Sequence, residues 1–389
     1  MNNSVKQILV VDDEPDLQML MMQKFRHKVK SREYEFLFAE DGREALEKIG
    51  DHTNLSLILC DINMPRMDGL TLLNELQELD RHDLKTVMVS AYGDMENIRT
   101  AMNRGAYDFV TKPIDFSDLE TTIEKSLREI DRIRKAREME EQLEALNFDL
   151  DMAARIQQKI LHQDFPVFPD DERFDIYAKM IAARHVGGDF YDFFKFDENH
   201  LAFFIGDVAG KGMPASIYMA VCRTMLKAIG SEILDPADCI SRVNNMLIPE
   251  SDTTTFVTVF YGVLNLKSGT LSYCNGGHNL PYLVTKSGEV SELADAGGLL
   301  LGKFENAPYE SGIIDLNPGD AIITYTDGVT EAENENDQMF DEERLVKFLE
   351  SHGGKKVDPL TQGLFLEVMK FAGAAEQSDD ITALSVRLS

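Results

Sequence analysis

The second half of the sequence contains four groups of aspartates whose residue types suit a site for divalent cations. The groups are Asp189 with Asp192, Asp207, Asp327, and Asp379 with Asp380. Each group adjoins an apolar run that predicts a buried strand, as 201–205 does ahead of Asp207. Carboxylates at strand ends beside glycine-rich turns supply the oxygen ligands that hard divalent cations bind.

Any one of these groups could instead be a turn in which aspartate and glycine serve only the turn geometry. Four of them, each beside an apolar strand, favour one shared site, because exposed loops tolerate other polar residues equally well. The combined carboxylates are sufficient for two cations. Two metals about 3.5–4 Å apart can activate a bridging water and stabilise an in-line displacement at phosphorus.

The elements that must position these aspartates predict a layered α+β sandwich. From about residue 163 to 389, strands follow one another in hairpin succession, while the helices are grouped apart. The predicted strands are 174–180, 191–196, 201–205, 255–264, 269–275, 282–285, 313–316, 321–326 and 381–388. The predicted helices form one block at about 214–247 and a later block that includes 342–350.

Residues 1 to about 120 have a different pattern, in which strands alternate with amphipathic helices. The strands are 7–11, 34–38, 55–60, 86–89 and 108–110. Five such units predict a parallel sheet with helices on both faces, and ligands of such sheets bind beyond the carboxyl ends of the strands. The residues at those ends are Asp12, Asp13, Asp61, Ser90 and Lys112. This set suits a magnesium ion and a phosphoryl group.

This first pattern resembles the CheY-like receiver domain of two-component response regulators, which has a flavodoxin-like fold. The matching motifs are Asp12-Asp13, 61–69, Ser90-Ala91 and Lys112-Pro113. The resemblance implies that Asp61 accepts a phosphoryl group. The implied ligands of a Mg²⁺ ion are Asp12, Asp13, Asp61 and the carbonyl of Asn63, with Asp12 helping through water. The implied switch positions are Ser90 and Phe109, and Lys112 would pair with the phosphoryl oxygens.

The segment from 116 to about 162 contains no proline or glycine and predicts one long connecting helix. Two sets of apolar or small residues follow heptad spacing, which is typical of a coiled coil. The sets are Leu119, Ile123, Ser126, Ile130 and Ile133, then Leu143, Leu146, Leu150, Ala153, Gln157 and Ile160. They do not join in register across 134–140, and such a break locally unwinds or overwinds a coiled coil.

We therefore predict a coiled-coil linker over 121–162 and a homodimer formed through it. A solvated helix between two domains is the alternative. The break at 134–140 suggests the hypothesis that the state of the first domain alters helix pairing further along the chain. The predicted domain boundaries are 1–120, 121–162 and 163–389.

From about residue 153 to 389, ordered motifs resemble the SpoIIE/RsbU branch of the metal-dependent serine/threonine phosphatases (protein phosphatase 2C-like, PPM). The motifs are the four acidic groups, with 154–161 ahead of them and 275–281 between them. The resemblance implies two Mn²⁺ or Mg²⁺ ions. The implied ligands are Asp189, Asp207, Asp327, Asp379, Asp380 and the carbonyl of Val208. Asp380 and Asp192 have the alternative role of orienting metal-bound waters.

Two further positions bear on catalysis. Arg184 matches a position that grips substrate phosphate in some relatives, a role that suits a planar guanidinium, although a surface salt bridge is the alternative. Eukaryotic members of the superfamily have a histidine two residues after the aspartate matching Asp207, but this chain has Ala209 there. The proton donor to the leaving group is therefore unassigned, with His278 and His185 as candidates.

Composition limits the classes of function. A chain of 389 residues with 43% hydrophobic residues predicts two or three globular domains. The formal charge of −29 argues against a nucleic-acid partner and against anionic membrane surfaces. The four cysteines are scattered, which predicts neither a zinc site nor a disulfide framework. There is no signal pattern and no apolar run of membrane-spanning length, so we expect a cytoplasmic protein.

The sequence thus predicts a response regulator whose output is a metal-dependent phosphoprotein phosphatase. The expected partners are a sensor histidine kinase and a phosphorylated anti-sigma-factor antagonist of the STAS type. Activation by phosphorylation of Asp61 is the usual expectation for this architecture, although the residues themselves do not give the direction. A non-catalytic module that sequesters a partner is the alternative. A nucleotide cyclase is disfavoured, because Phe190-Tyr191-Asp192 breaks the GGDEF signature that Gly187-Gly188-Asp189 begins.

Overall fold

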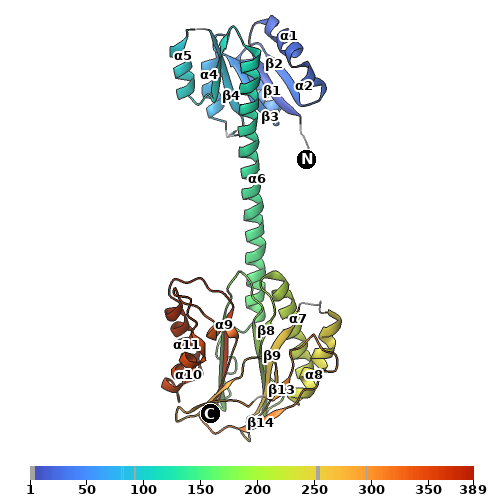
Figure 1. The fold of residues 1–389 in the computed structure, drawn as a ribbon, viewed down its shortest axis with the longest axis vertical. Helices are drawn as coiled ribbons and strands as arrows, with labels where there is room; N and C mark the ends of the chain where they lie inside the picture. The colour runs from blue at the N-terminus through green and yellow to red at the C-terminus, as the bar shows by residue number, and fades with distance from the viewer. Residues whose placement is uncertain (1–4, 80, 82, 92, 251–254, 295) are drawn as a thin grey trace. The chain divides into compact units, whose positions relative to one another are not determined.

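The first five predicted strands form one parallel sheet in the computed structural model, which describes residues 5–389 except 80, 82, 92, 251–254 and 295. The strands are β1 (Lys6–Val11), β2 (Tyr34–Ala39), β3 (Leu55–Asp61), β4 (Lys85–Ala91) and β5 (Asp108–Lys112). Their order in the sheet is β2-β1-β3-β4-β5 (Figure 1). The predicted doubly wound fold is confirmed, and its acidic residues follow the carboxyl ends of β1 and β3.

Two of the helices between these strands begin at an aspartate that caps them. They are α1 (Pro15–Lys24), α2 (Arg26–Lys30), α3 (Gly42–Asp51), α4 (Gly69–Gln77) and α5 (Met95–Asn103). Asp41 accepts hydrogen bonds from the first free backbone N–H groups of α3, and Asp68 does so for α4. Proline at the first turn of α1 starts that helix without losing a hydrogen bond.

Helix α6 (Phe116–Ile160) is continuous over 45 residues, as the absence of proline and glycine predicted. Its first turns bury Leu119, Ile123 and Ile130 in the same apolar cluster as residues of β1, β3 and β4. The first heptad set therefore packs on the parallel sheet of its own chain and not against a second helix. Leu143 and Leu146 of the second set have exposed fractions of 58% and 55%. The register break at 134–140 separates the buried residues of the first set from the exposed Leu143 and Leu146 of the second set.

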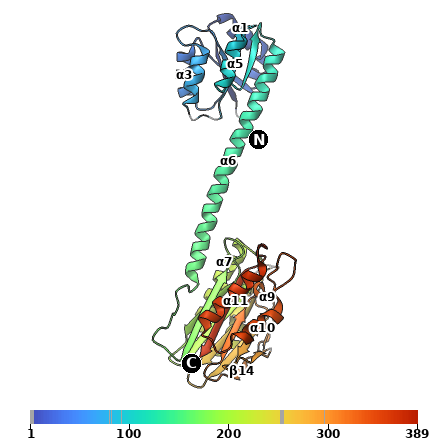
Figure 2. The same ribbon diagram turned by 90° about the vertical axis from the view of Figure 1, so that its left-hand side faces the viewer.

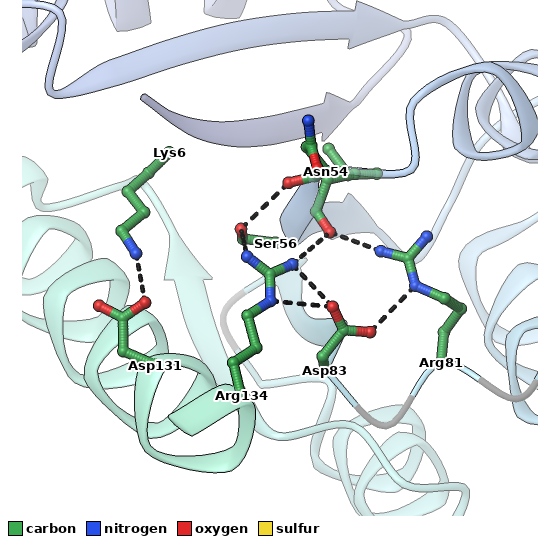
Figure 3. Close-up of polar contacts among 8 residues, drawn as sticks. Lys6, Asn54, Ser56, Arg81, Asp83, Asp131 and Arg134 are labelled. Atoms are coloured by element: carbon green, nitrogen blue, oxygen red, sulfur yellow. Dashed lines mark hydrogen bonds and ion pairs between the residues drawn. The ribbon is translucent and has the colours of Figure 1, made fainter. Parts of the chain in front are cut away.

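Figure 3 shows how polar contacts fasten α6 to the edge of the sheet where the strands begin. The Arg134 guanidinium donates to Asp83 at 2.7 and 2.9 Å and to Ser56 Oγ at 3.2 Å. Arg81 also donates to Asp83, at 3.0 Å, and Lys6 pairs with Asp131 of α6. Ser56 lies near the beginning of β3 and Asp61 is its last residue. This network therefore lies at the opposite end of the strands from the acidic residues.

The chain divides into two compact units, Met1–Leu146 and Asn147–Ser389, hereafter the first and second units. The second unit contains two largely antiparallel sheets, with strand orders β13-β10-β9-β8-β7, to which β14 adds by pairing with β10, and β12-β11-β15-β16-β6. Their strands are β6 (Phe174–Ile181), β7 (Phe190–Lys195), β8 (His200–Val208), β9 (Val257–Asn265), β10 (Thr270–Gly276), β11 (Tyr282–Val284), β12 (Val290–Glu292), β13 (Gly297–Gly298), β14 (Gly312–Asp315), β15 (Ala321–Tyr325) and β16 (Ile381–Leu388).

The two sheets face each other and helices cover both outer faces (Figures 1 and 2). One apolar cluster joins Phe203 of β8 to Leu384 of β16 and continues to Leu226 of α7. A second cluster lies between the other sheet and its own helices. Strand β8 is buried on both sides, which explains its continuous apolar run. The predicted layered sandwich is confirmed.

The helices of this unit are α7 (Met213–Gly230), α8 (Pro236–Leu247), the 3₁₀ turn η1 (Ile248–Glu250), α9 (Asp327–Thr330), α10 (Asp341–Ser351) and α11 (Val357–Ala372). The predicted block at 214–247 is two helices, because Asp235 caps a new helix and Pro236 starts it. Strands β12 and β13 were not predicted, being only three and two residues long. Among the described residues, no helix is both long and apolar enough to cross a membrane.

We predict that Arg134→Ala loosens α6 from the first unit. Loss of charged hydrogen bonds between partly buried groups costs about 2 kcal/mol, which should accelerate amide exchange in β3 and β4 peptides roughly thirtyfold. Hydrogen–deuterium exchange with mass spectrometry measures this. The matched control is Arg132→Ala, because Arg132 is 81% exposed in its side chain. Equal exchange in the two variants would show that the Arg134 network contributes nothing to stability.

Candidate functional site

The first unit gathers its predicted acidic ligands at one edge of the sheet. The ligand oxygens of Asp12, Asp13 and Asp61 all lie within 4.8 Å of one another. Lys112 Nζ lies 2.7 Å from Asp61 Oδ2 and 3.0 Å from Asp12 Oδ2. Burial alone would lower the pKa of Lys112, but these hydrogen bonds outweigh it and raise the pKa. A firmly charged lysine beside clustered carboxylates suits binding of a cation and a phosphoryl group.

The other predicted residues of the first unit are Asn63, Ser90 and Phe109. The Asn63 backbone N–H donates to Asp61 Oδ1 at 3.3 Å. Ser90 is fully buried and its hydroxyl has no hydrogen-bond partner among the described residues. Phe109 is 38% exposed. Glu14, which the sequence analysis did not single out, also pairs with Lys112, at 3.1 Å.

In the second unit, Asp189 is held at the start of β7 with its carboxylate almost fully buried. Its Oδ2 accepts hydrogen bonds from the hydroxyls of Thr326 at 2.7 Å and Thr382 at 2.6 Å. These threonines follow β15 and lie in β16, so Asp189 joins the two sheets. Burial and the charges of Asp207 and Asp380 raise the pKa of Asp189 well above its ordinary value.

The other aspartates converge on Asp189. Burial, together with the charges of Asp327 and Asp379, raises the pKa of Asp207 to about 7. Burial and the charge of Asp379 likewise raise the pKa of Asp327. Carboxylates affect one another in this way only at short range in a poorly solvated place. Asp189, Asp207, Asp327 and Asp379 therefore share one site, although among the described residues only the first unit brings three acidic oxygens within 4.8 Å.

Asp380 has a different environment from its neighbour Asp379. Its two carboxylate oxygens accept hydrogen bonds from the backbone N–H groups of Ala183 at 2.8 Å and Gly188 at 2.7 Å. A Cβ on Gly187 would lie 2.1 Å from Asp380 Oδ2, and a Cβ on Gly328 would lie 2.0 Å from the Asp380 carbonyl oxygen. Asp380 thus fastens the loop that carries Asp189, and these two glycines allow the loops to approach.

The same loop is also held by α6. The Gln157 side chain donates to the Gly187 carbonyl at 2.7 Å and accepts from the Gly187 N–H at 3.1 Å. Gln157 was predicted to lie on a coiled-coil seam, but it is buried against this loop. The end of α6 therefore contacts the segment next to Asp189.

Family models match both units. Residues 8–124 match the response regulator receiver domain, and residues 197–389 match stage II sporulation protein E (SpoIIE). This chain combines a receiver domain with a SpoIIE-type domain. Asp207, Asp327 and Asp379 of the acidic site fall within the SpoIIE match, whereas Asp189 precedes it.

Two curated relatives and one solved structure agree with this assignment. Protein IcfG of Synechocystis is 29% identical over 266 residues, which is 61% of this chain and 41% of IcfG. Phosphoserine phosphatase RsbU of Bacillus subtilis is 26% identical over 239 residues, which is 61% of this chain and 70% of RsbU. The chain thus spans about two fifths of IcfG. The SiaA-PP2C domain of Pseudomonas aeruginosa has a TM-score of 0.56 at 22% identity, covering 64% of this chain and 99% of that domain, and shows the shared fold.

Asp192 lies outside the acidic site of the SpoIIE-type domain, contrary to the expectation that it orients metal-bound waters. Its fully buried carboxylate is 2.9 Å from His162 Nε2, 2.6 Å from Arg223 Nη2 and 3.1 Å from Lys227 Nζ. Burial would raise the pKa of Asp192, but these partners lower it below its ordinary value. Asp192 joins β7 to α7 and to the chain following α6.

The two histidine candidates differ in position. His278 is buried, its Nδ1 lies 2.9 Å from Thr258 Oγ1, and burial lowers its pKa to about 4. A neutral, enclosed imidazole cannot protonate a leaving group at neutral pH, so His278 is a structural residue. His185 and Arg184 are both exposed. Their side chains remain available to a substrate, and their roles stay predictions.

The acidic site of the SpoIIE-type domain fits divalent cations. Its donors are hard carboxylate oxygens, and the raised pKa values of Asp189 and Asp207 reflect burial and repulsion from other carboxylates, which a cation would offset. A Cβ on Gly188 would lie 2.8 Å from the Val208 carbonyl oxygen, so this carbonyl faces the same loop. The residues that would hold cations are Asp189, Asp207, Asp327, Asp379 and the Val208 carbonyl.

Three residues that the sequence analysis did not single out belong to this site. Thr326 and Thr382 orient Asp189, and Lys211 pairs with Asp379 at 2.8 Å. The two threonines adjoin the predicted aspartates in sequence, which was the available signal. Lys211 lies four residues after Asp207 in a glycine-rich turn, where its partner could not be predicted.

We predict that cation binding at this site depends on pH. The raised folded-state pKa of Asp207 means that its contribution to stability without a cation is present at low pH and lost as pH rises through about 7. A divalent cation must displace that proton below about pH 7, so Mn²⁺ affinity should weaken at least about tenfold for each unit by which the pH is lowered below 7. Calorimetric titration at constant ionic strength measures the affinity. Equal affinities at about pH 6 and pH 8 would contradict the prediction.

Proposed function

We propose that this protein is a two-component response regulator whose output is a metal-dependent serine/threonine phosphoprotein phosphatase. The convergence of Asp189, Asp207, Asp327 and Asp379 is the single observation that carries this proposal. These residues come from four separate places in the sequence, and the charges of Asp207, Asp327 and Asp379 affect the pKa values of their neighbours, which supports one shared site. A domain that only sequesters a partner would have no need of all four.

The chain's own residues supply most of the arrangement that hydrolysis requires. Thr326 and Thr382 fix the direction of the Asp189 carboxylate, and Asp380 fixes its loop. Fixed ligands need no reorganisation during the reaction, which is the main advantage of a preorganised site. Two Mn²⁺ or Mg²⁺ ions, when bound, would supply an activated water and neutralise charge on the phosphoryl group.

We propose a substrate protein phosphorylated on serine or threonine. The name of the relative RsbU, a phosphoserine phosphatase, supports this class. By the resemblance to that branch, the substrate is a phosphorylated anti-sigma-factor antagonist of the STAS type. The phosphate group would be the common recognition element, because the cation site contacts the phosphate and not the remaining side chain.

We propose that phosphorylation of Asp61 by a sensor histidine kinase controls the phosphatase, with Mg²⁺ at Asp12, Asp13, Asp61 and the carbonyl of Asn63. A phosphoryl group can shift the protein between states only through its different stability in each state. Helix α6 is the element shared by the two units, and the exposed Leu143 and Leu146 of the second heptad set support a homodimer formed through it. Ser90, Phe109 and Lys112 are the proposed switch residues.

Asp207→Asn tests the enzyme assignment. Loss of one charged ligand should reduce Mn²⁺-dependent phosphate release from a phosphoserine protein by at least about a hundredfold, while the fold is kept. The matched control is Asp197→Asn, because Asp197 is an exposed acid before the other end of β8. Release of phosphate at the wild-type rate by Asp207→Asn would refute the assignment.

Asp61→Asn tests the control by phosphorylation. This variant should keep its basal phosphatase rate and lose any response to acetyl phosphate, because Asp61, 2.7 Å from Lys112, is the proposed phosphoacceptor. The measurement is phosphate release before and after incubation with the donor. Asp108→Asn, at the opposite end of β5, is the control and should respond like the wild type. A response that survives in Asp61→Asn would place the phosphoacceptor elsewhere.

A further inference from the structure

A single lysine lies at the exposed side of the acidic site. Lys211 Nζ is 2.8 Å from Asp379 Oδ2 and donates to the Ser378 carbonyl at 2.7 Å. Its side chain is 43% exposed, and that of Asp379 is 32% exposed. The ammonium group therefore lies beside one carboxylate of the site and is open to solvent.

The turn that carries Lys211 holds it in this place. Gly210 and Gly212, on either side, have positive φ values of 105° and 76°, a conformation that glycine adopts readily. A Cβ on either glycine would meet open space, so the turn is not covered by other parts of the described chain. Asp207 precedes the turn and α7 follows it, and both ends are thus fixed by the core.

The two contacts of Lys211 do not use its full hydrogen-bonding capacity. A lysine side chain carries a positive charge at neutral pH. An ammonium has three protons, and the two contacts named above use two of them.

We propose that Lys211 binds the phosphate of the phosphoprotein substrate, an inference that rests on the proposed function. A phosphomonoester dianion bound at the cation site would come within reach of the third proton of this ammonium. Cations bound by Asp379 would also weaken the ion pair between this carboxylate and Lys211. Arg184, which the resemblance offered for this role, is exposed and on a different loop, whereas Lys211 is already fixed at the carboxylates.

The competing explanation is that Lys211 only neutralises Asp379. The two roles make opposite predictions. If Lys211 binds phosphate, its removal weakens phosphate binding and leaves the affinity for cations nearly unchanged. If Lys211 only neutralises Asp379, its removal leaves Asp379 without a counter-charge, which tightens cation binding and does not change phosphate affinity.

The test uses the full-length protein with Mn²⁺ and inorganic phosphate as the probe. Lys211→Met should weaken phosphate binding, measured by thermal shift, about 10- to 100-fold, as expected for one charge-assisted hydrogen bond. KM for the phosphoprotein should rise by a similar factor, with a smaller change in kcat. Lys211→Arg should recover part of the phosphate affinity. Mn²⁺ affinity should stay within about threefold of the wild type, since no cation ligand is lost.

Lys347→Met is the matched control, because Lys347 also pairs with a carboxylate, Glu343, at 2.7 Å on α10. It should bind phosphate like the wild type. Wild-type phosphate affinity in Lys211→Met, with tighter Mn²⁺ binding, would overturn the proposal. Phosphate binding is measured without turnover, so a wild-type protein that binds phosphate but hydrolyses no phosphoprotein would refute the proposed function and leave the Lys211 test intact.

Discussion

Repulsion between carboxylates is the constraint on which the SpoIIE-type domain depends. Asp189, Asp207 and Asp327 have raised pKa values because each is partly or fully removed from water beside other acids. Such an arrangement opposes folding, so the rest of the domain must hold it in place. Two sheets packed through a large apolar core provide that stability. The acids lie where strands of both sheets end, and no single strand could carry all of them.

Hydrogen bonds fasten the loops of the site. Asp380, Thr326 and Thr382 all bind the segment of Asp189 or its carboxylate. Asp192 performs a comparable task at the other side of β7, where it binds Arg223 and Lys227 of α7 and His162 of the chain after α6. Acidic side chains in this domain therefore have two roles: some form the cation site, and others hold its supports.

The sequence predicted the architecture well, because apolar runs and their spacing depend on local burial. It also proposed which aspartates form the cation site, since each followed or preceded such a run, and that assignment stays a prediction. It did not separate Asp192 from the cation site, because the partners Arg223 and Lys227 are more than thirty residues away in sequence. The heptad set beginning at Leu119 was misleading for a related reason: helix spacing records one apolar face and does not identify what covers it.

The loop contacts around Asp380 limit how this domain can change during evolution. Gly187 and Gly328 come from distant parts of the chain, and each leaves space that residue 380 occupies. Any larger residue at either position would collide with Asp380 before it affected a carboxylate of the site. Descendants of this domain can therefore lose or exchange acids one at a time and still fold, whereas replacement of either glycine would disturb the scaffold itself. A lineage that abandoned catalysis would be expected to keep both glycines long after its aspartates had diverged.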